Sequence, residues 1–283
     1  MRIRKRIWNF FICILITLVV FISIFPPLWM FLTSIKKPLD TMARPPVLLS
    51  IPPSLENWIE LFNPEGRWEG GKILTVMMPN SIIASLTSTF LTIVTSFFAA
   101  YSLSRFNFRG RKPIAFFIIA TRMLPPIATV FPLYLLMNQV GLRDTLIALI
   151  LVYTTLNIPL AVWMLKAFVD EVPRAIEEAA LIDGASRVYM LIKIVLPLVA
   201  PGLVATSIFS FLLAWNDFVI AFFLTGLRAK TLPLASTAFM TEMGIFWGPM
   251  GAFGTLVMAP AILFSFFASK YLIKGLTLGA VKA

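Results

Sequence analysis

Five polar or aromatic residues within long apolar stretches have side chains that could bind a hydroxyl-rich solute. They are Tyr153, Asn157, Trp215, Asn216 and Asp217. Polar groups inside a hydrocarbon layer are costly, so they usually face the interior of a helix bundle or a water-filled cavity. Aromatic rings beside amide and carboxylate groups suit sugar hydroxyls, and they suit contacts between helices equally well. The five residues are therefore candidates for a solute path, with helix packing as the open alternative.

A second stretch is distinguished by its charge. Residues 177–198 read EEAALIDGASRVYMLIKIVLPL, and the charged side chains in and before it are Asp170, Glu171, Arg174, Glu177, Glu178, Asp183 and Arg187. Each would cost about 2.5–3.5 kcal/mol at the centre of a membrane, or on the order of 20 kcal/mol together. This stretch is therefore expected outside the hydrocarbon layer.

The local sequence of this stretch predicts two short helices joined by a turn. Pro173 suits a first helical position, and residues 174–182 are mostly good helix formers. Gly184 can take the left-handed conformation that ends a helix, and Ser186 can cap the next one. Pro197 then marks the start of the next apolar run.

The first predicted helix has a small apolar face with an acidic edge. Ile176, Ala179 and Ala180 recur at helical spacing beside Glu177 and Glu178. Such a surface suits docking into a groove of another protein. A charged connector between two apolar runs would show the same periodicity, so the pattern alone leaves both interpretations open.

Composition and hydropathy indicate an integral membrane protein. Of the 283 residues, 59% are hydrophobic and 13% are charged, and the mean hydropathy is +0.90. Six continuous apolar runs are long enough to cross a hydrocarbon layer about 30 Å thick as helices. They are residues 7–32, 79–102, 114–137, 145–168, 198–224 and 250–269. We therefore expect an all-α membrane protein with six transmembrane helices.

These runs divide the chain into three predicted regions. Residues 1–78 comprise the first transmembrane helix and an outer loop, because the run at 7–32 is too long for the apolar part of a signal peptide. Residues 79–270 form the transmembrane core, which includes the charged loop at about 169–197. Residues 271–283 form a tail in the cytoplasm.

The distribution of lysine and arginine predicts the orientation. The net charge of +11 comes from 24 basic and 13 acidic residues. The basic residues are concentrated in the segments that lie inside when both termini are cytoplasmic. Orientation in the membrane therefore explains the positive charge without any nucleic acid. Arg122 falls inside the third run, and we expect it to make a structural contact because a charge at that depth needs a partner or water.

Two features of the composition exclude most enzymatic chemistry. The sequence has no histidine and a single cysteine, Cys13, so it can form neither a Ser-His-acid or Cys-His arrangement nor a His-ligated metal centre. Residues 66–72 fit G-x-x-x-x-G-K, but Ile73 follows where a phosphate-binding loop needs Ser or Thr. We therefore expect this chain to be no enzyme and to bind no cofactor, so that any ATP chemistry belongs to a partner.

The charged loop resembles a known motif. Its fixed positions are Glu178-Ala179-Ala180, then Gly184 after three residues, then Ile194-x-Leu196-Pro197 after nine more. This pattern is similar to the EAA loop of the binding-protein-dependent ABC importer permeases. The stretches VPRAIEEAALIDGAS, YSLSRFNFRGRK, AWNDF and KGLTLGAVKA resemble the maltose-type, carbohydrate-uptake branch of that family. The resemblance therefore runs through the whole chain.

The resemblance implies a six-helix permease of the MetI-like, maltose-permease-like fold in a prokaryotic inner membrane. It implies a second permease subunit that is a different chain, two ATPase subunits that hold ATP and Mg²⁺, and an extracytoplasmic solute-binding protein. It also implies that the motif residues couple the permease to the ATPase, namely Glu178, Ala179, Ala180, Gly184, Ile194, Leu196 and Pro197. The loop at 225–248 is expected to reach toward the binding protein.

Three classes of function remain for comparison. The leading one is import of a carbohydrate, such as an oligosaccharide, coupled to ATP hydrolysis by partner subunits. The alternative within the family is a non-sugar solute, such as a polyol or a glycerol phosphodiester. A secondary transporter would more often show paired carboxylates or inverted repeats, and a membrane enzyme would need catalytic groups that this sequence lacks.

Overall fold

Helices form most of the chain in the computed structural model, which describes residues 2–68, 70–242 and 244–280. The helices are α1 (Arg2–Ser34), α2 (Glu56–Phe62), α3 (Gly70–Lys72), α4 (Met78–Arg105), α5 (Arg111–Ala120), α6 (Pro126–Gln139), α7 (Leu146–Glu171), α8 (Arg174–Ile182), α9 (Arg187–Met190), α10 (Leu196–Leu198), α11 (Ala200–Trp215), α12 (Val219–Leu224) and α13 (Trp247–Ala280). They are joined by the 3-10 turns η1 (Pro38–Met42), η3 (Thr121–Met123) and η5 (Leu232–Phe239) and by the π-helical turns η2 (Ile73–Met77) and η4 (Leu191–Val195). Strands β1 (Met240–Thr241) and β2 (Gly244–Ile245) form an antiparallel pair.

Among the described residues, four helical segments are long and apolar enough to cross a membrane. They are Trp8–Ser34, Ile73–Arg105, Leu146–Glu171 and Trp247–Phe267. Up to six spans result when each of two bent helix pairs counts as one span. The predicted all-α membrane fold is therefore confirmed, and six spans are compatible with the lengths and composition of these helices.

The third apolar run is broken, so the prediction of one continuous helix over 114–137 is wrong. Segments Arg111–Met123 and Ile127–Gln139 meet at an angle of 97°. Leu124 and Pro125 between them are extended, with ψ angles of 128° and 136°. Each of these two residues precedes a proline, which pushes it out of the helical region.

The fifth apolar run is broken as well, and the prediction of one helix over 198–224 is wrong. It begins at a 75° bend between Arg187–Leu198 and α11, where Pro201 has no amide with which to continue the preceding helix. It breaks again between α11 and α12. At that break the Asn216 amide donates to the Leu212 carbonyl at 2.9 Å, and such side-chain bonds compete with the helical ladder.

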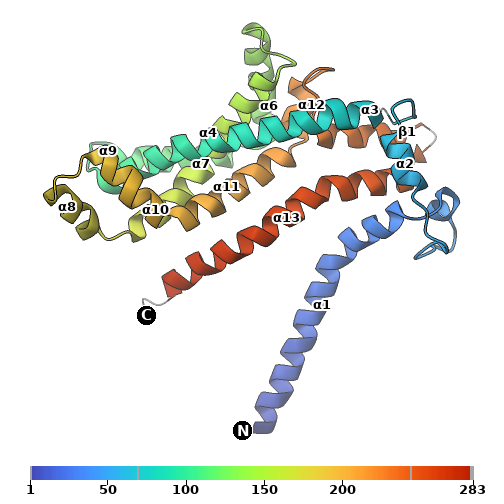
Figure 1. The fold of residues 1–283 in the computed structure, drawn as a ribbon, viewed down its shortest axis with the longest axis horizontal. Coiled ribbons are helices and arrows are strands. Elements are labelled where there is room, and N and C mark those ends of the chain that lie inside the picture. Colours follow the sequence, from blue (N-terminus) through green and yellow to red (C-terminus); the bar gives the residue numbers. More distant parts are fainter. Residues whose placement is uncertain (1, 69, 243, 281–283) are drawn as a thin grey trace. The chain divides into compact units, whose positions relative to one another are not determined.

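One compact unit contains residues 75–234 and 261–283, and α4, α7 and α11 lie side by side in it (Figure 1). Most buried residues of α4 are small, among them Ser81, Ala84, Ser85, Ser88, Thr92, Ser96 and Ala100. The Thr154 hydroxyl of α7 donates to the Ser88 carbonyl at 3.4 Å, and the Thr92 hydroxyl donates to the Thr154 carbonyl at 3.5 Å. Small side chains allow this close approach of membrane helices, and the hydroxyls then bond across it.

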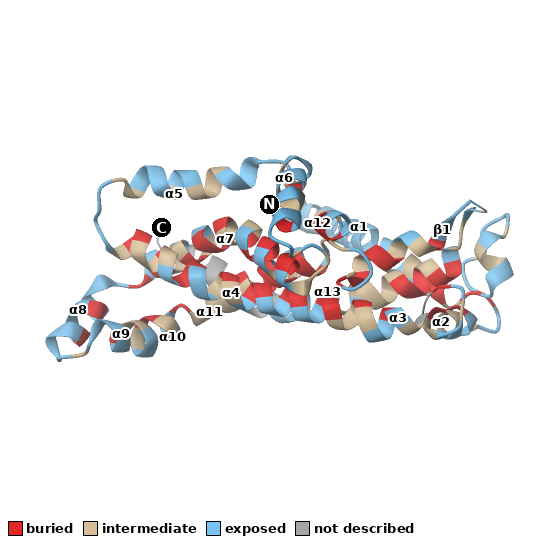
Figure 2. Ribbon diagram, turned by 90° about the horizontal axis from the view of Figure 1, so that it is seen from above, coloured by how far each residue is buried: buried red, intermediate tan, exposed pale blue. Residues whose placement is uncertain are grey.

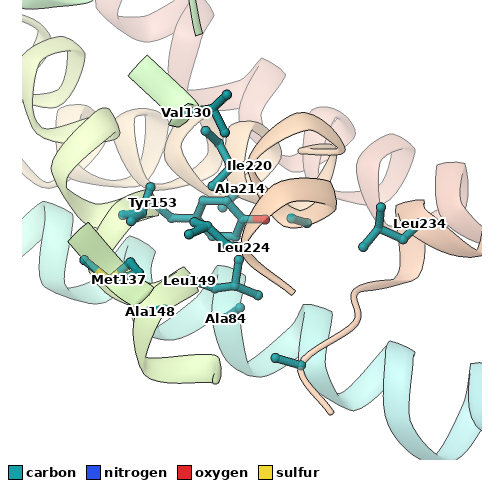
Figure 3. Packing of buried hydrophobic residues seen from close by; sticks show 13 residues of the cluster. Ala84, Val130, Met137, Ala148, Leu149, Tyr153, Ala214, Ile220, Leu224 and Leu234 are labelled. Atoms are coloured by element: carbon teal, nitrogen blue, oxygen red, sulfur yellow. The ribbon is translucent and has the colours of Figure 1, made fainter. Parts of the chain in front are cut away.

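Two apolar clusters fill this bundle. In the first, shown in Figure 3, Val130 of α6 and Tyr153 of α7 pack with Ile220 and Leu224 of α12. The second cluster lies near the end of α4, the end of α7 and the start of α11. It consists of Phe97, Ala100, Leu165, Val169, Val172, Val195 and Val199. Figure 2 shows that buried residues are concentrated along α4 and α7, whereas α5 and α8 are mostly exposed.

The other compact unit contains residues 1–74 and 235–260. Trp68 is buried in it between two phenylalanine rings, with centroid distances of 5.2 Å to Phe239 and 4.8 Å to Phe246. The last helix, α13, continues to Ala280, so most of the predicted tail is helical and residues 281–283 lie outside the described part of the chain.

Candidate functional site

The charged loop forms a helical hairpin at one end of the α4, α7 and α11 bundle (Figure 1). We call residues 174–198 the hairpin; its first helix is α8 and its second is the continuous helix formed by α9, η4 and α10. Its turn is a Schellman motif, in which the Gly184 amide donates to the Leu181 carbonyl at 3.1 Å and the Ala185 amide to the Ala180 carbonyl at 3.0 Å. Gly184 has a φ of +86°, so the predicted left-handed glycine is confirmed.

The ends of the two hairpin helices are also fixed locally. The Ser186 hydroxyl accepts the Tyr189 amide at 3.2 Å, which confirms the predicted cap. Pro173 has extended backbone angles and precedes α8 as its N-cap, one position earlier than predicted. The backbone geometry of the hairpin therefore follows from residues within the hairpin itself.

The seven motif residues divide between the surface and the interior of the hairpin. Glu178, Ala179, Gly184 and Pro197 are exposed, Ile194 and Leu196 are partly buried, and Ala180 is buried. Ala180, Gly184 and Ile194 line one open hollow of about 490 Å³ together with Tyr189. Motif positions from both helices therefore meet at one surface feature.

Large apolar side chains are exposed on the hairpin, and one of them, Tyr189, lines this hollow. Ile182 is 85% exposed, Val188 is 66% exposed and Tyr189 is 57% exposed. Exposed apolar side chains grouped in this way are typical of a protein-binding surface, although in a membrane protein they also occur on lipid-facing helices. Here they lie beside the exposed acid Glu178, which is unsuited to lipid.

The prediction of an acidic edge formed by both glutamates is wrong for Glu177. Glu177 and Ala180 are the buried residues of α8. They lie three positions apart and so share one helix face, which is turned toward α4. The Glu177 carboxylate accepts the Arg105 guanidinium at 2.6 Å and the Tyr101 hydroxyl at 2.8 Å. Sequence analysis missed this contact, and its only local signal is an arginine that ends an apolar run.

The candidate solute residues lie where α7 meets the break in the fifth run. The Tyr153 hydroxyl donates to the Asp217 carboxylate at 3.2 Å, and Asp217 also accepts the Ala221 amide of α12 at 3.1 Å. The Asn157 amide, one turn further along α7, donates to the Ser210 carbonyl of α11 at 3.3 Å. These contacts bring together residues of the fourth and the fifth apolar run.

Trp215 and Asn216 differ in their exposure. Trp215 is 3% exposed and stacks on Phe211 with a centroid distance of 5.6 Å. Asn216 is exposed. Tyr153, Asn157 and Trp215 are therefore in the interior of the folded chain, whereas Asn216 and the half-buried Asp217 have surface available for a solute.

Arg122 has the structural contact that we expected. It lies in η3 at the bend of the third run, and its guanidinium donates to the Leu156 carbonyl of α7 at 3.1 Å. The side chain is otherwise exposed. Arg122 therefore connects the bend of the third run to α7 by a hydrogen bond to a backbone carbonyl.

The loop at 225–248 begins with a tightly held segment that sequence analysis did not identify. The Asp144 carboxylate accepts the backbone amides of four successive residues, Gly226, Leu227, Arg228 and Ala229. Burial alone would raise the pKa of Asp144, but these amides outweigh it and lower the pKa. Asn80 donates to the carbonyls of Arg228 and Lys230, and the Ser81 hydroxyl accepts the Leu232 amide. Contacts with α4 and with the α6–α7 turn therefore fix the start of this loop.

Metal-ligating side chains do not converge in the described residues. No group of three or more His, Cys, Asp or Glu residues is close enough there to hold a metal ion. The arrangements that stand out are instead a surface hairpin, a pair of broken spans and a fixed loop base.

Comparisons with known proteins agree with these features. Residues 92–278 match the family model of the binding-protein-dependent transport system inner membrane component. The probable ABC transporter permease protein y4oR of Sinorhizobium fredii is 37% identical over 279 residues, which cover 99% of this chain and 96% of that protein. The trehalose/maltose transport system permease protein MalG of Thermococcus litoralis is 33% identical over 267 residues, which cover 94% of each chain.

A solved structure shares the fold. The crystal structure of a bacterial ABC transporter involved in the import of the acidic polysaccharide alginate matches with a TM-score of 0.78 at 19% identity. The match covers 94% of this chain and 96% of that chain. The family model, in turn, spans the hairpin and both broken runs. This chain, a multi-pass membrane protein, therefore belongs to the family of binding-protein-dependent transport system inner membrane components, the permease subunits of ABC transporters.

Proposed function

We propose that this chain is one permease subunit of an ABC importer that carries a carbohydrate across the cytoplasmic membrane of a prokaryote. The observation that carries the proposal is the family match over residues 92–278, which includes the whole hairpin. A relative named for trehalose and maltose transport, aligned over 94% of this chain, supports a sugar as the solute.

The hairpin is the part that receives the ATPase in this proposal. Its exposed apolar side chains and the neighbouring Glu178 form a mixed surface that a groove on an ATPase subunit would cover. Gly184 shapes that surface by turning the second helix back. Two ATPase subunits hold ATP and Mg²⁺ and carry out the hydrolysis, and this chain binds no cofactor itself.

The remaining partners lie in the membrane and outside it. A second, different permease subunit completes the path, and a solute-binding protein delivers the carbohydrate to the loop at 225–248. The fixed base of that loop supports this role, because it holds the start of the loop in a defined place against α4 and the α6–α7 turn. Within the path, Asn216 and Asp217 face the solute at the break between α11 and α12, where the helix is interrupted and both polar residues are at least partly exposed.

Reconstitution of the complete complex in proteoliposomes tests this function. We expect uptake of labelled oligosaccharide that needs ATP inside the vesicle and binding protein outside it. A polyol and a glycerol phosphodiester, offered with the same components, distinguish the solute classes. Uptake driven by an ion gradient without the ATPase subunits would contradict an ABC importer and would support a secondary transporter.

A further inference from the structure

Arg105 and Glu177 form an ion pair buried between the last residue of α4 and the first helix of the hairpin. The guanidinium Nε and the carboxylate Oε1 are 2.6 Å apart, and each side chain is 8% exposed. The second carboxylate oxygen accepts the Tyr101 hydroxyl at 2.8 Å. Both oxygens of Glu177 therefore bind side chains of α4.

The guanidinium of Arg105 also binds the end of α7. Its Nη2 donates to the Val169 carbonyl at 2.9 Å and to the Val172 carbonyl at 2.7 Å, and its Nη1 donates to the Ser104 hydroxyl at 3.1 Å. The planar guanidinium has five donors in a fixed arrangement, so it can hold several acceptors at once. Arg105 thus joins α4, the end of α7 and α8 at one point.

Further contacts surround this joint. The Ser104 hydroxyl donates to the Asp170 carboxylate at 2.5 Å, and Arg174 of α8 donates to the Ser104 carbonyl at 3.2 Å. The second helix of the hairpin is attached differently, because Val195 and its neighbours belong to the apolar cluster with Phe97 and Leu165. The first helix is therefore held by polar contacts and the second by apolar ones.

The first helix has little else to hold it. Of the nine residues of α8, all of which the structure describes, Glu177 and Ala180 are the buried ones. Without the ion pair, the hydrogen bonds that remain between α8 and α4 are those of Arg174 with the Ser104 carbonyl and of Glu177 with the Tyr101 hydroxyl, among the contacts described here. The ion pair is therefore the one contact between opposite charges that joins α8 to α4 among the contacts described here.

We infer that the Arg105–Glu177 ion pair transmits movement of α8 into α4, which spans the membrane. This inference rests on the proposed function, in which the ATPase moves the hairpin. It separates two adjacent glutamates: exposed Glu178 belongs to the surface that meets the ATPase, and buried Glu177 is a positioning residue that connects this surface to the spans. Truncating either partner of a buried ion pair leaves the other charge unpaired, so the pair acts as a unit.

The test is a double-mutant cycle in the complete complex in proteoliposomes. The variants are Glu177→Gln, Arg105→Gln and the double variant, and three quantities are measured: ATPase co-purification, stimulated hydrolysis and solute taken up per ATP. We expect the ATPase to remain bound and active while uptake per ATP falls by about tenfold in each single variant. The double variant should be no worse than either single variant, because both changes break the same contact.

Matched controls separate this role from general stability. Lys166→Gln breaks a more exposed ion pair, with Asp170, and leaves the contact between Arg105 and Glu177 in place, so it should leave uptake per ATP unchanged. The double variant leaves no unpaired charge, so it should fold even where a single variant does not, and it should still lower uptake per ATP. It keeps the test decisive if the single charge variants fail to reach the membrane.

Two results would overturn the inference. The first is wild-type uptake per ATP in both single charge variants, or in the double variant if only that variant folds. The second is loss of ATPase binding in Glu177→Gln, which would place this residue in the docking surface. Failure of the proposed function is a separate result, because the wild-type complex itself would then show no ATP-dependent uptake.

Discussion

The carboxylate of Asp144 accepts the backbone amide of Gly226 at 2.7 Å, and it accepts the amides of the three following residues as well. Asp144 itself has a φ of +58°, an uncommon angle for a residue with a side chain. A Cβ at Gly226 would lie 3.0 Å from a carboxylate oxygen of Asp144, so any larger residue there would have to displace this carboxylate slightly. One side chain in the α6–α7 turn therefore holds the base of the loop at 225–248.

Removal of this carboxylate is expected to loosen the loop base. Asp144→Ala leaves several backbone amides without an acceptor and should lower the free energy of unfolding by about 2 kcal/mol. Asp144→Asn keeps one acceptor oxygen and should cost less. Thermal melting of the purified permease in detergent measures both, with the exposed acid Glu65→Ala as the control. An unchanged melting temperature for Asp144→Ala would show that the loop base does not depend on this residue.

The hydrogen bonds of Asp144 also predict that the stability of the folded chain depends on pH. The pKa of Asp144 in the folded chain lies below its value in the unfolded chain, so its stabilising contribution is complete above the unfolded pKa of about 3.9. It is lost as the pH falls through the lower, folded pKa. The difference in melting temperature between wild type and Asp144→Asn should therefore be constant from about pH 6 to 8 and shrink below about pH 4. A difference that grows on acidification would contradict this assignment.

Exposure separates the candidate solute residues into two groups with different mutant behaviour. Asn216→Ala should lower oligosaccharide uptake with little effect on stability, because Asn216 is exposed at the break in the fifth run. Tyr153→Phe removes a buried hydrogen bond to Asp217 and should lower the free energy of unfolding by about 1 kcal/mol. Uptake and melting temperature are measured for both variants. Normal uptake by Asn216→Ala would remove this residue from the solute path.

The hairpin turn should require glycine at position 184 because of its backbone conformation. Lack of room for a side chain is not the reason. In the described part of the chain no atom lies within 4 Å of a Cβ built there, yet the φ is +86°. Gly184→Val should therefore strain the turn by about 1–2 kcal/mol and weaken ATPase co-purification, while the protein still inserts into the membrane. Gly184→Asn is the matched control, because asparagine tolerates this conformation better. Equal co-purification with both variants would refute a role for the turn geometry.

Single-cysteine labelling tests the predicted orientation. On a Cys13→Ser background, Ser186→Cys in the hairpin turn should react with a membrane-permeant reagent and resist an impermeant one in intact cells. Glu65→Cys, in the predicted outer loop, should react with the impermeant reagent. The expectation follows from the concentration of basic residues in the inner segments. Labelling of Ser186→Cys by the impermeant reagent alone would reverse the topology.

The sequence by itself determined the features that depend on neighbouring residues. The apolar runs had the length of membrane helices, and Gly184 and Ser186 predicted the turn and cap that the structure contains. These predictions hold because a left-handed glycine and an N-cap act on backbone groups only a few positions away. The bend at Leu124 also has a local cause, the two prolines after it, although its angle of 97° was not predictable.

The tertiary structure decided which faces meet. Glu177 and Glu178 are chemically identical in the sequence, and one of them became buried because of the rotation of α8 about its own axis. That rotation is set by Arg105, 72 positions earlier in the chain, and by the end of α7. Likewise Asp144 reached the amides of residues 226–229 only because α6, α7 and α12 pack together. Contacts between residues so far apart depend on how whole helices pack, which no local pattern in the sequence encodes.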